Sequence, residues 1–161
     1  NPMKQFLVLL FAVIMMACSG GGDPAPTPTP PTPTVSVATL VKKVWTVNTA
    51  QWDGVTKYDK TSSSNVVQGY SQYKLDLSTA GSVTLTEFDG KIFTGTYSVA
   101  TDGLSLTLNG LTSADGAPTG TGGTISYSIL VTPTATSLSL QQTTAYVKAS
   151  SAIVKLALVN P

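Results

Sequence analysis

The feature that most constrains the fold of this chain is an alternation of apolar and polar residues, which recurs from residue 44 almost to the C-terminus. In the segment 73–77, Tyr73, Leu75 and Leu77 alternate with polar residues. Segments of this kind are 44–48, 70–77, 83–85, 92–99, 104–108, 125–131, 138–140 and 154–158. A period of two is typical of antiparallel strands with one buried face. Apart from a helical turn that we allow between residues 55 and 64, no segment has a convincing helical period.

The dipeptide Asp-Gly occurs four times, and it marks the expected turns. Both residues tolerate the positive φ angles that tight hairpins require. The four copies are Asp53-Gly54, Asp89-Gly90, Asp102-Gly103 and Asp115-Gly116. Two of them separate consecutive predicted strands, which indicates a meander. One long loop, residues 109–123, interrupts the series.

An eight-stranded meander has two sheet edges that would promote aggregation if they stayed exposed. Closure into a barrel removes both edges. We therefore predict an all-β fold, an eight-stranded antiparallel up-and-down barrel, in which the strands 44–49 and 154–158 pair. A barrel of this size is either filled by side chains or holds one small ligand. The alternative is an immunoglobulin-like sandwich, which would need longer crossing connections than most of those found here.

The N-terminal residues have the pattern of a bacterial lipoprotein leader. An unbroken apolar run, residues 6–16, follows Lys4 and is too short to span a bilayer. The run leads into Met15-Met16-Ala17-Cys18, which resembles the bacterial lipobox, in which small residues precede a cysteine that is lipidated and becomes the new N-terminus. We predict that residues 1–17 are a signal peptide and that Cys18 carries the lipid.

A linker rich in glycine and proline follows the cysteine. Residues 24–34 alternate proline with small residues, and at about 3.1 Å per residue in polyproline II they would extend roughly 34 Å. We predict that residues 18–38 form the lipidated N-terminus and a disordered linker, and that residues 39–161 form the barrel. The expected location is the cell envelope, with the lipid anchoring the chain in the outer membrane.

The composition argues against several classes of function. The chain has no histidine, its single cysteine is Cys18, and its charged residues amount to 11% with a net charge of +1. None of its nine basic residues is arginine, so the electrostatic pattern of a nucleic-acid binder is missing. Without an imidazole or a free thiol in the domain, we expect no enzyme, no cofactor and no metal site.

The carboxylates are the only remaining catalytic candidates, and most have a structural explanation. Four of the eight acidic residues belong to Asp-Gly turns, while Asp23 lies in the linker and Asp59 in a polar loop. Asp76 and Glu87 lie in or beside adjacent strands, where paired acids of a hydrolase could meet. Nothing in their spacing selects that role, and we expect both on a solvated outer face.

Four short motifs, taken in order, carry a family resemblance. They are Leu40-Val-Lys-Lys-Val-Trp45, Trp52-Asp53-Gly54, Phe93-Thr94-Gly95-Thr96-Tyr97 and Leu104-Ser-Leu-Thr-Leu108. This order resembles the lipocalin-like lipoproteins common in Bacteroidetes, over residues 40–159. The resemblance implies a lipocalin-like barrel with Trp45 closing one end.

The candidate ligand-binding residues are aromatic residues that share the inward parity: Trp45, Tyr73, Phe93, Tyr97 and Tyr127. They would either pack the core or line a cavity, since a buried tyrosine hydroxyl needs a partner. Trp52 has the opposite parity to Trp45 and is expected to be exposed. We therefore expect a monomeric, membrane-anchored, non-enzymatic barrel, either binding a small apolar or amphipathic ligand or serving as an envelope component. The sandwich alternative would act as a surface adhesive or a carbohydrate-binding module.

Overall fold

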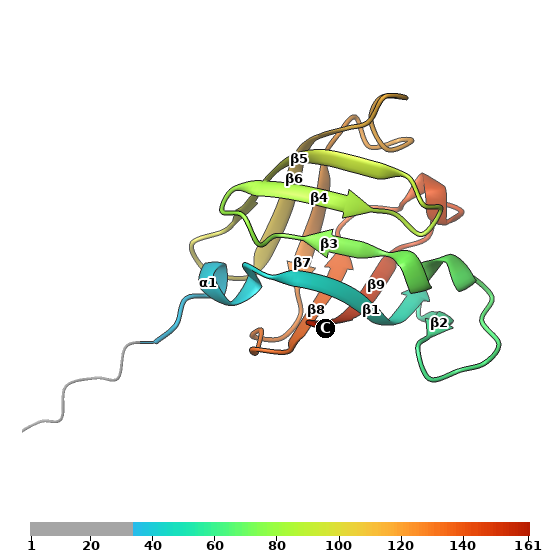
Figure 1. Cartoon of the computed structure of the whole chain (residues 1–161), viewed down its shortest axis with the longest axis horizontal. Coiled ribbons are helices and arrows are strands. Elements are labelled where there is room, and N and C mark those ends of the chain that lie inside the picture. Colours follow the sequence, from blue (N-terminus) through green and yellow to red (C-terminus); the bar gives the residue numbers. More distant parts are fainter. Residues whose placement is uncertain (1–33) are drawn as a thin grey trace, which may run out of the picture. The chain divides into compact units, whose positions relative to one another are not determined.

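The computed structural model describes residues 34–161. The elements are α1 (Val37–Val41), β1 (Val44–Trp52), β2 (Val55–Asp59), the 3-10 helix η1 (Gln68–Gln72), β3 (Lys74–Asp76), β4 (Ser82–Thr86), β5 (Ile92–Val99), β6 (Ser105–Thr112), β7 (Ile125–Ile129), β8 (Ser137–Gln142), the 3-10 helix η2 (Val147–Ala149) and β9 (Val154–Val159). Figure 1 shows β3, β4 and β5 crossing in front of β7, β8 and β9. The predicted signal peptide, Cys18 and most of the linker lie outside the described residues.

Eight of the strands form a closed antiparallel ring. From β3 to β9 each strand pairs with the next one in the sequence, and β1 pairs with both β3 and β9. The closing ladder sets Val47 opposite Leu158 and Trp52 opposite Val154. The predicted up-and-down barrel and the pairing of its first and last strands are both confirmed. A sandwich of two separate sheets is not what the chain forms.

The strand β2 is an addition that the sequence pattern did not predict. It pairs with the C-terminal half of β1, on the same edge of β1 that β3 occupies nearer the N-terminus. The helical turn allowed for residues 55–64 was wrong, because the Asp53-Gly54 turn folds the chain straight back along β1. The outer edge of β2 is covered locally. Asn65 Oδ1 accepts the amide N–H of Asp59 at 2.8 Å, and the Val67 amide donates to the Lys57 carbonyl at 3.0 Å.

The short helix α1 closes one end of the barrel. It begins after Ser36, whose hydroxyl oxygen accepts the amide N–H of Thr39, as is typical of an N-cap. Its last residue, Val41, is fully buried, and the carbonyl of Val41 accepts the indole N–H of Trp45 at 2.8 Å. Trp45 therefore lies at a closed end, as the resemblance implied. The helix starts two residues before the expected boundary at residue 39, and Val37 packs against the core.

A β-bulge in β1 changes which of its residues face inward. Val47 pairs with Leu158 and Thr49 with Ala157, so Asn48 is the extra residue. An extra residue reverses the inward and outward parity of the strand beyond it. The expectation that Trp52 is exposed was wrong for this reason. Trp52 is half-buried against the core and donates its indole N–H to the Tyr70 hydroxyl at 2.8 Å.

Several strand ends differ from the predicted segments. Of the segment 70–77, only residues 74–76 form a strand, since η1 occupies its beginning. The strand β6 continues to Thr112, so the long connection before β7 is shorter than expected. Leu104 and Val131 were grouped with inward residues, but their side chains are 64% and 67% exposed because both lie beyond the ends of their strands.

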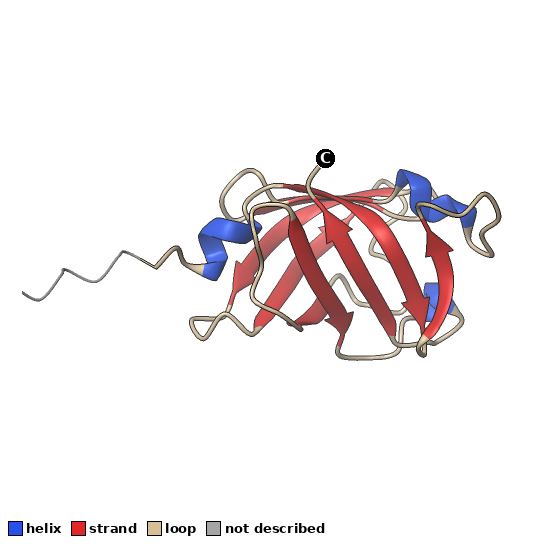
Figure 2. Cartoon of the chain, turned by 90° about the horizontal axis from the view of Figure 1, so that it is seen from below, coloured by secondary structure: helices blue, strands red, loops and turns tan. Residues whose placement is uncertain are grey.

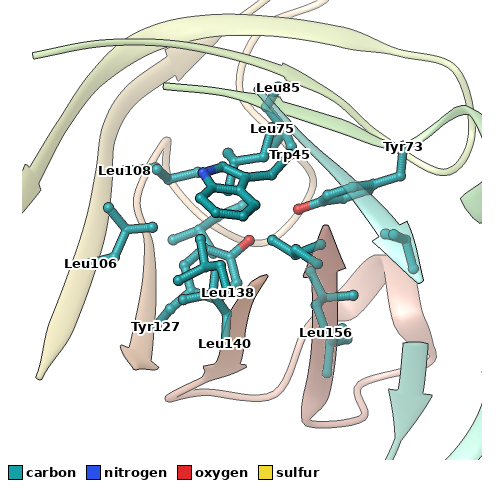
Figure 3. Packing of buried hydrophobic residues seen from close by; sticks show 14 of the residues in the cluster. Trp45, Tyr73, Leu75, Leu85, Leu106, Leu108, Tyr127, Leu138, Leu140 and Leu156 are labelled. Carbon is teal, nitrogen blue, oxygen red and sulfur yellow. The ribbon is translucent and has the colours of Figure 1, made fainter. Parts of the chain in front are cut away.

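The interior is filled by side chains. Leu75, Leu85, Leu108 and Leu140 have no exposed surface, and Trp45 lies among them (Figure 3). Together with the other fully buried leucines, these side chains fill the interior of the barrel. At about 25 cal/mol for each Å² of apolar surface removed from water, this burial is the dominant stabilising contribution. The eight-stranded barrel thus takes the filled form and not the hollow one.

The inward and outward positions of β6 offer a sharp test of this packing. Leu106 is fully buried, whereas its neighbour Thr107 is half-buried on the outer face. We expect Leu106→Asp to lower the free energy of unfolding by at least about 4 kcal/mol, because it removes a packed side chain and buries an unpaired charge. Thr107→Asp should cost less than about 1 kcal/mol. Urea denaturation of the two variants measures both; similar costs would contradict the assigned faces.

Candidate functional site

The five predicted ligand-binding residues belong to the packed interior. Trp45, Tyr73, Phe93 and Tyr127 are each 3% exposed or less. Tyr97 is half-buried, and its hydroxyl donates to the Leu77 carbonyl at 3.0 Å. None of these five residues lines any of three pockets that open on the described domain. The structure therefore places the predicted set in the core, where it does not enclose a free ligand cavity.

The polar side chains of the interior gather at the end of the barrel opposite α1, which we call the distal end. Figure 2 shows α1 at one end of the barrel and the two 3-10 helices at the other. The distal end is formed by the connections 53–54, 87–91, 113–124 and 143–153. We call the polar residues that meet there the distal cluster: Glu87, Asp89, Gln142, Tyr146 and Lys148.

Glu87 is the buried acid of the distal cluster. It follows β4 directly and is only 2% exposed, with its Oε1 accepting the Tyr146 hydroxyl at 2.5 Å and its Oε2 accepting the Phe88 amide at 3.3 Å. Burial raises the pKa of Glu87, and the bond from Tyr146 and the charge of Lys148 offset that only in part. The expectation of a solvated outer face was therefore wrong for Glu87.

The expectation of a solvated outer face fits Asp76 better than it fits Glu87. Asp76 is half-buried, and its Oδ1 accepts the amide and the hydroxyl of Ser78 at 3.0 and 2.6 Å. These bonds lower the pKa of Asp76. Glu87 is instead hydrogen-bonded to Tyr146 across the distal end. Asp76 and Glu87 therefore have separate hydrogen-bond partners.

Lys148 links two parts of the distal end through its charge. Its Nζ lies 2.8 Å from Asp89 Oδ2, without the alignment of a hydrogen bond. The same ammonium lies 5.2 Å from the ring centre of Phe93 and 5.8 Å from that of Phe88. A cation over aromatic rings is attracted by their electron-rich faces. Lys148 thus fastens the connection 143–153 onto the turn 87–91.

Besides Lys148 Nζ, two buried polar atoms near this end have no hydrogen-bond partner within residues 34–161: the Tyr73 hydroxyl and Gln142 Oε1. Both residues are more than nine-tenths buried. Gln142 is paired directly opposite Tyr127 on β7. Burial raises the pKa of Tyr127 to about 12 and that of Tyr73 well above its usual range, so both phenols stay neutral. A buried polar group without a partner costs roughly 1–3 kcal/mol, so these atoms are local weak points of the core.

Two signals in the sequence could have identified part of the distal cluster. Glu87 has the same parity as Val83 and Leu85, and Gln142 has the same parity as Leu138 and Leu140. Extending the alternation by one step would have placed both side chains inside. Tyr146 and Lys148 lie in a connection without periodicity, and no pattern marks them. Within the described residues, no group of three or more potential metal ligands comes together.

Comparisons with known proteins give one structural likeness. The chain is similar to a lipocalin-like protein from Bacteroides uniformis ATCC 8492, solved by crystallography, with 15% sequence identity and a TM-score of 0.46. The match covers 74% of this chain and 96% of that one. No protein-family model matches the sequence, and no curated protein matches it.

The burial of Glu87 predicts how stability depends on pH. Its pKa is raised in the folded chain from an ordinary value of 4.5, so ionisation is harder in the folded than in the unfolded state. Its contribution to stability is therefore lost as pH rises from about 4.5 through the raised value. Glu87→Gln keeps an acceptor for Tyr146 and removes the charge. We expect it to gain stability relative to the native protein as pH rises, measured by thermal unfolding between pH 4 and 8.

Asp76→Asn serves as the control, because its stability relative to the native protein should change with pH in the opposite direction. The lowered pKa of Asp76 means that its carboxylate stabilises the fold at neutral pH, and this is lost as pH falls through its folded value. This variant should be less stable than the native protein at pH 7 and should approach it in acid. A Glu87→Gln variant with the same pH profile as the native protein would contradict the burial of the charge.

Proposed function

We propose that this chain is a lipid-anchored envelope protein with a packed, non-enzymatic barrel that acts through its distal end. The observation that carries this proposal is the filled interior. Trp45 and the surrounding leucines occupy the space in which a hollow barrel would hold its cargo. The polar side chains and the long connections lie at the distal end instead, where another molecule can approach without unpacking the core.

The proposed anchor rests on the sequence before residue 34. Cys18 follows an apolar run of signal-peptide length, and no other residue of the chain is a cysteine. No helix within residues 34–161 has the length and apolar character needed to cross a bilayer. The described domain begins near α1, so the lipid would be attached from the α1 side of the barrel. In this proposal the protein is a monomer in the outer membrane.

The small apolar or amphipathic ligand becomes a weaker part of this proposal than the sequence suggested. Entry of an apolar ligand would require displacement of fully buried residues such as Leu75 and Leu108. Displacing packed side chains costs several kcal/mol each, by analogy with core substitutions. An amphipathic molecule could still contact the distal end with its polar group. The sandwich alternative, an adhesive or carbohydrate-binding module, is not favoured because the strands close into a ring.

The absence of enzymatic activity is also part of this proposal. The chain has no histidine, so the imidazole that commonly moves protons in hydrolases is not present. The buried acid Glu87 accepts the Tyr146 proton donor, and Lys148 lies against Asp89. These groups satisfy one another and stabilise a connection. Such an arrangement suits a structural latch better than a reactive centre.

Lipidation can be tested directly by metabolic labelling. We expect a palmitate analogue to label the native protein in bacterial cells and not the variant Cys18→Ala, because only a thiol can carry the diacylglycerol thioether. The labelled protein should fractionate with membranes. Equal labelling of both proteins, or a soluble native protein, would rule out the anchor.

The filled interior can be tested separately from the anchor. Addition of palmitate to the full chain should cause no saturable change in tryptophan fluorescence, because Trp45 is already enclosed by protein. A matched variant, Leu108→Ala, opens space beside the core and should gain affinity for small apolar molecules, as cavities in packed proteins do. Saturable binding of palmitate to the native protein at micromolar concentration would show instead that the interior opens.

A further inference from the structure

A small pocket opens beside the distal cluster, between two connections of the barrel. Its volume is about 80 Å³. One wall comes from the connection before β7 and from the first residue of that strand, and the other from the end of β8 and the connection that follows it. The lining includes Gly120, Thr121, Ile125, Gln142, Thr144 and Tyr146.

The walls of this pocket are held in place by the surrounding structure. Val147 packs so closely on Gly120 that a Cβ at residue 120 would overlap it. The Thr121 hydroxyl donates to the Pro118 carbonyl at 2.7 Å and accepts the Gly123 amide at 3.0 Å. On the other wall, the Thr143 amide donates to the Ser126 carbonyl at 3.0 Å. The pocket is therefore a formed feature of the fold.

Gln142 supplies the most informative group in the pocket. It lies on the inner face of β8, is only 5% exposed, and lines the pocket with its side chain. Its Oε1 has no hydrogen-bond partner among the described residues. A buried amide oxygen without a partner is unfavourable, so turning the Gln142 amide to bring Oε1 against a hydrogen-bond donor in the pocket would be favourable.

The chemistry of the lining selects the class of ligand. None of the lining residues is charged. The nearby charged residues have other partners: Glu87 accepts the hydrogen bond of Tyr146, and Lys148 forms an ion pair with Asp89. The Tyr146 proton is committed to Glu87, which leaves the phenol oxygen as an acceptor. The threonine hydroxyls can both donate and accept. A neutral molecule with several hydroxyl groups fits this lining, whereas an ion would find no opposite charge in it.

The size of the pocket limits how much of a ligand can enter. A volume of about 80 Å³ has room for a few water molecules, since one needs at least about 10–15 Å³ on this measure. Only the end of a molecule enters, with the remainder in solvent. Ile125 and Tyr146, which are almost fully buried, supply a small apolar part of the lining that the C–H groups of a sugar can contact. We infer that this pocket binds the hydroxyl-rich end of a neutral carbohydrate, with the side-chain amide of Gln142 at its base turning to offer Oε1 as the acceptor.

This inference goes beyond the proposed function and does not depend on the anchor. It is tested with the isotopically labelled full chain in detergent micelles, titrated with glucose, N-acetylglucosamine and glycerol while amide resonances are recorded by NMR. Acetate and methylammonium are the charged comparison probes. We expect saturable shifts at residues 120–125 and 142–146 with at least one sugar, and none with either ion.

Two neighbouring glutamines provide a matched pair of variants. Gln142→Leu removes the inward acceptor, and Gln141→Leu changes the half-buried residue next to it on the outer face. Loss of one hydrogen bond at a buried site should weaken binding by about tenfold in Gln142→Leu. Gln141→Leu should bind as the native protein does. The unfolding temperature of Gln142→Leu should be unchanged or higher, since an unpaired buried group is removed.

A second variant guards against misfolding of the first. Thr144 is exposed at the rim of the pocket, and Thr144→Val removes its hydroxyl without touching the core. It should also weaken binding while leaving the barrel resonances in place. The inference is overturned if no neutral probe causes saturable shifts, if both glutamine variants bind alike, or if acetate or methylammonium binds as well as the sugars. In each of those cases the pocket holds only water or selects a different chemistry.

Discussion

The rest of this structure depends on the ladder between β1 and β9. Within residues 34–161, the pairing of these two strands turns the meander into a ring and joins the beginning of the described fold to its end. Their pairing removes the two edges that an open sheet would leave to neighbouring chains. It also completes the wall around the leucine core, because Val154, Leu156 and Leu158 face the interior from β9. Barrel closure and the enclosure of the core therefore depend on the same ladder.

That dependence explains why the bulge at Asn48 matters. Beyond the extra residue, the inward and outward positions of β1 are exchanged. Both halves of β1 therefore place apolar side chains inside. Without the bulge, Ala50 and Trp52 would face solvent. The bulge also turns Trp52 toward Tyr70, which places an aromatic group over the distal side of the core. A local irregularity thus allows one strand to serve both ends of the barrel.

The alternation of the sequence was enough to predict the barrel, because each inward residue repeats a signal that its neighbours share. It was not enough to predict β2. Residues 55–59 have one buried side chain, Tyr58, and their pairing depends on the turn at Asp53 and on the caps supplied by Asn65 and Val67. Such effects come from hydrogen bonds between specific atoms, and periodicity does not encode them.

For the candidate site, too, the alternation of the sequence predicted one part and missed another. The aromatic residues chosen for a cavity share the inward parity, and parity alone cannot separate a filled barrel from a hollow one. The distinction depends on summed side-chain volume, to which residues outside the aromatic set contribute, such as Leu111 and Leu138. Glu87 and Gln142 were available to the same parity argument. Glu87 was instead assigned to solvent because polar residues are mostly exposed, and Gln142 was given no place.

The two ends of the barrel close the core with different kinds of side chain. At the α1 end, Val41 and Trp45 close the core with apolar surface and one satisfied hydrogen bond. At the distal end, closure depends on a carboxylate, a phenol and an ammonium, and two buried polar atoms besides that ammonium keep no hydrogen-bond partner within the described residues. Apolar closure is cheaper, since a buried polar group must be paired to avoid a penalty. The α1 end demonstrates that this sequence can achieve it. The polarity of the distal end is therefore not a requirement of the barrel, and this is the physical reason for assigning a binding role to that end.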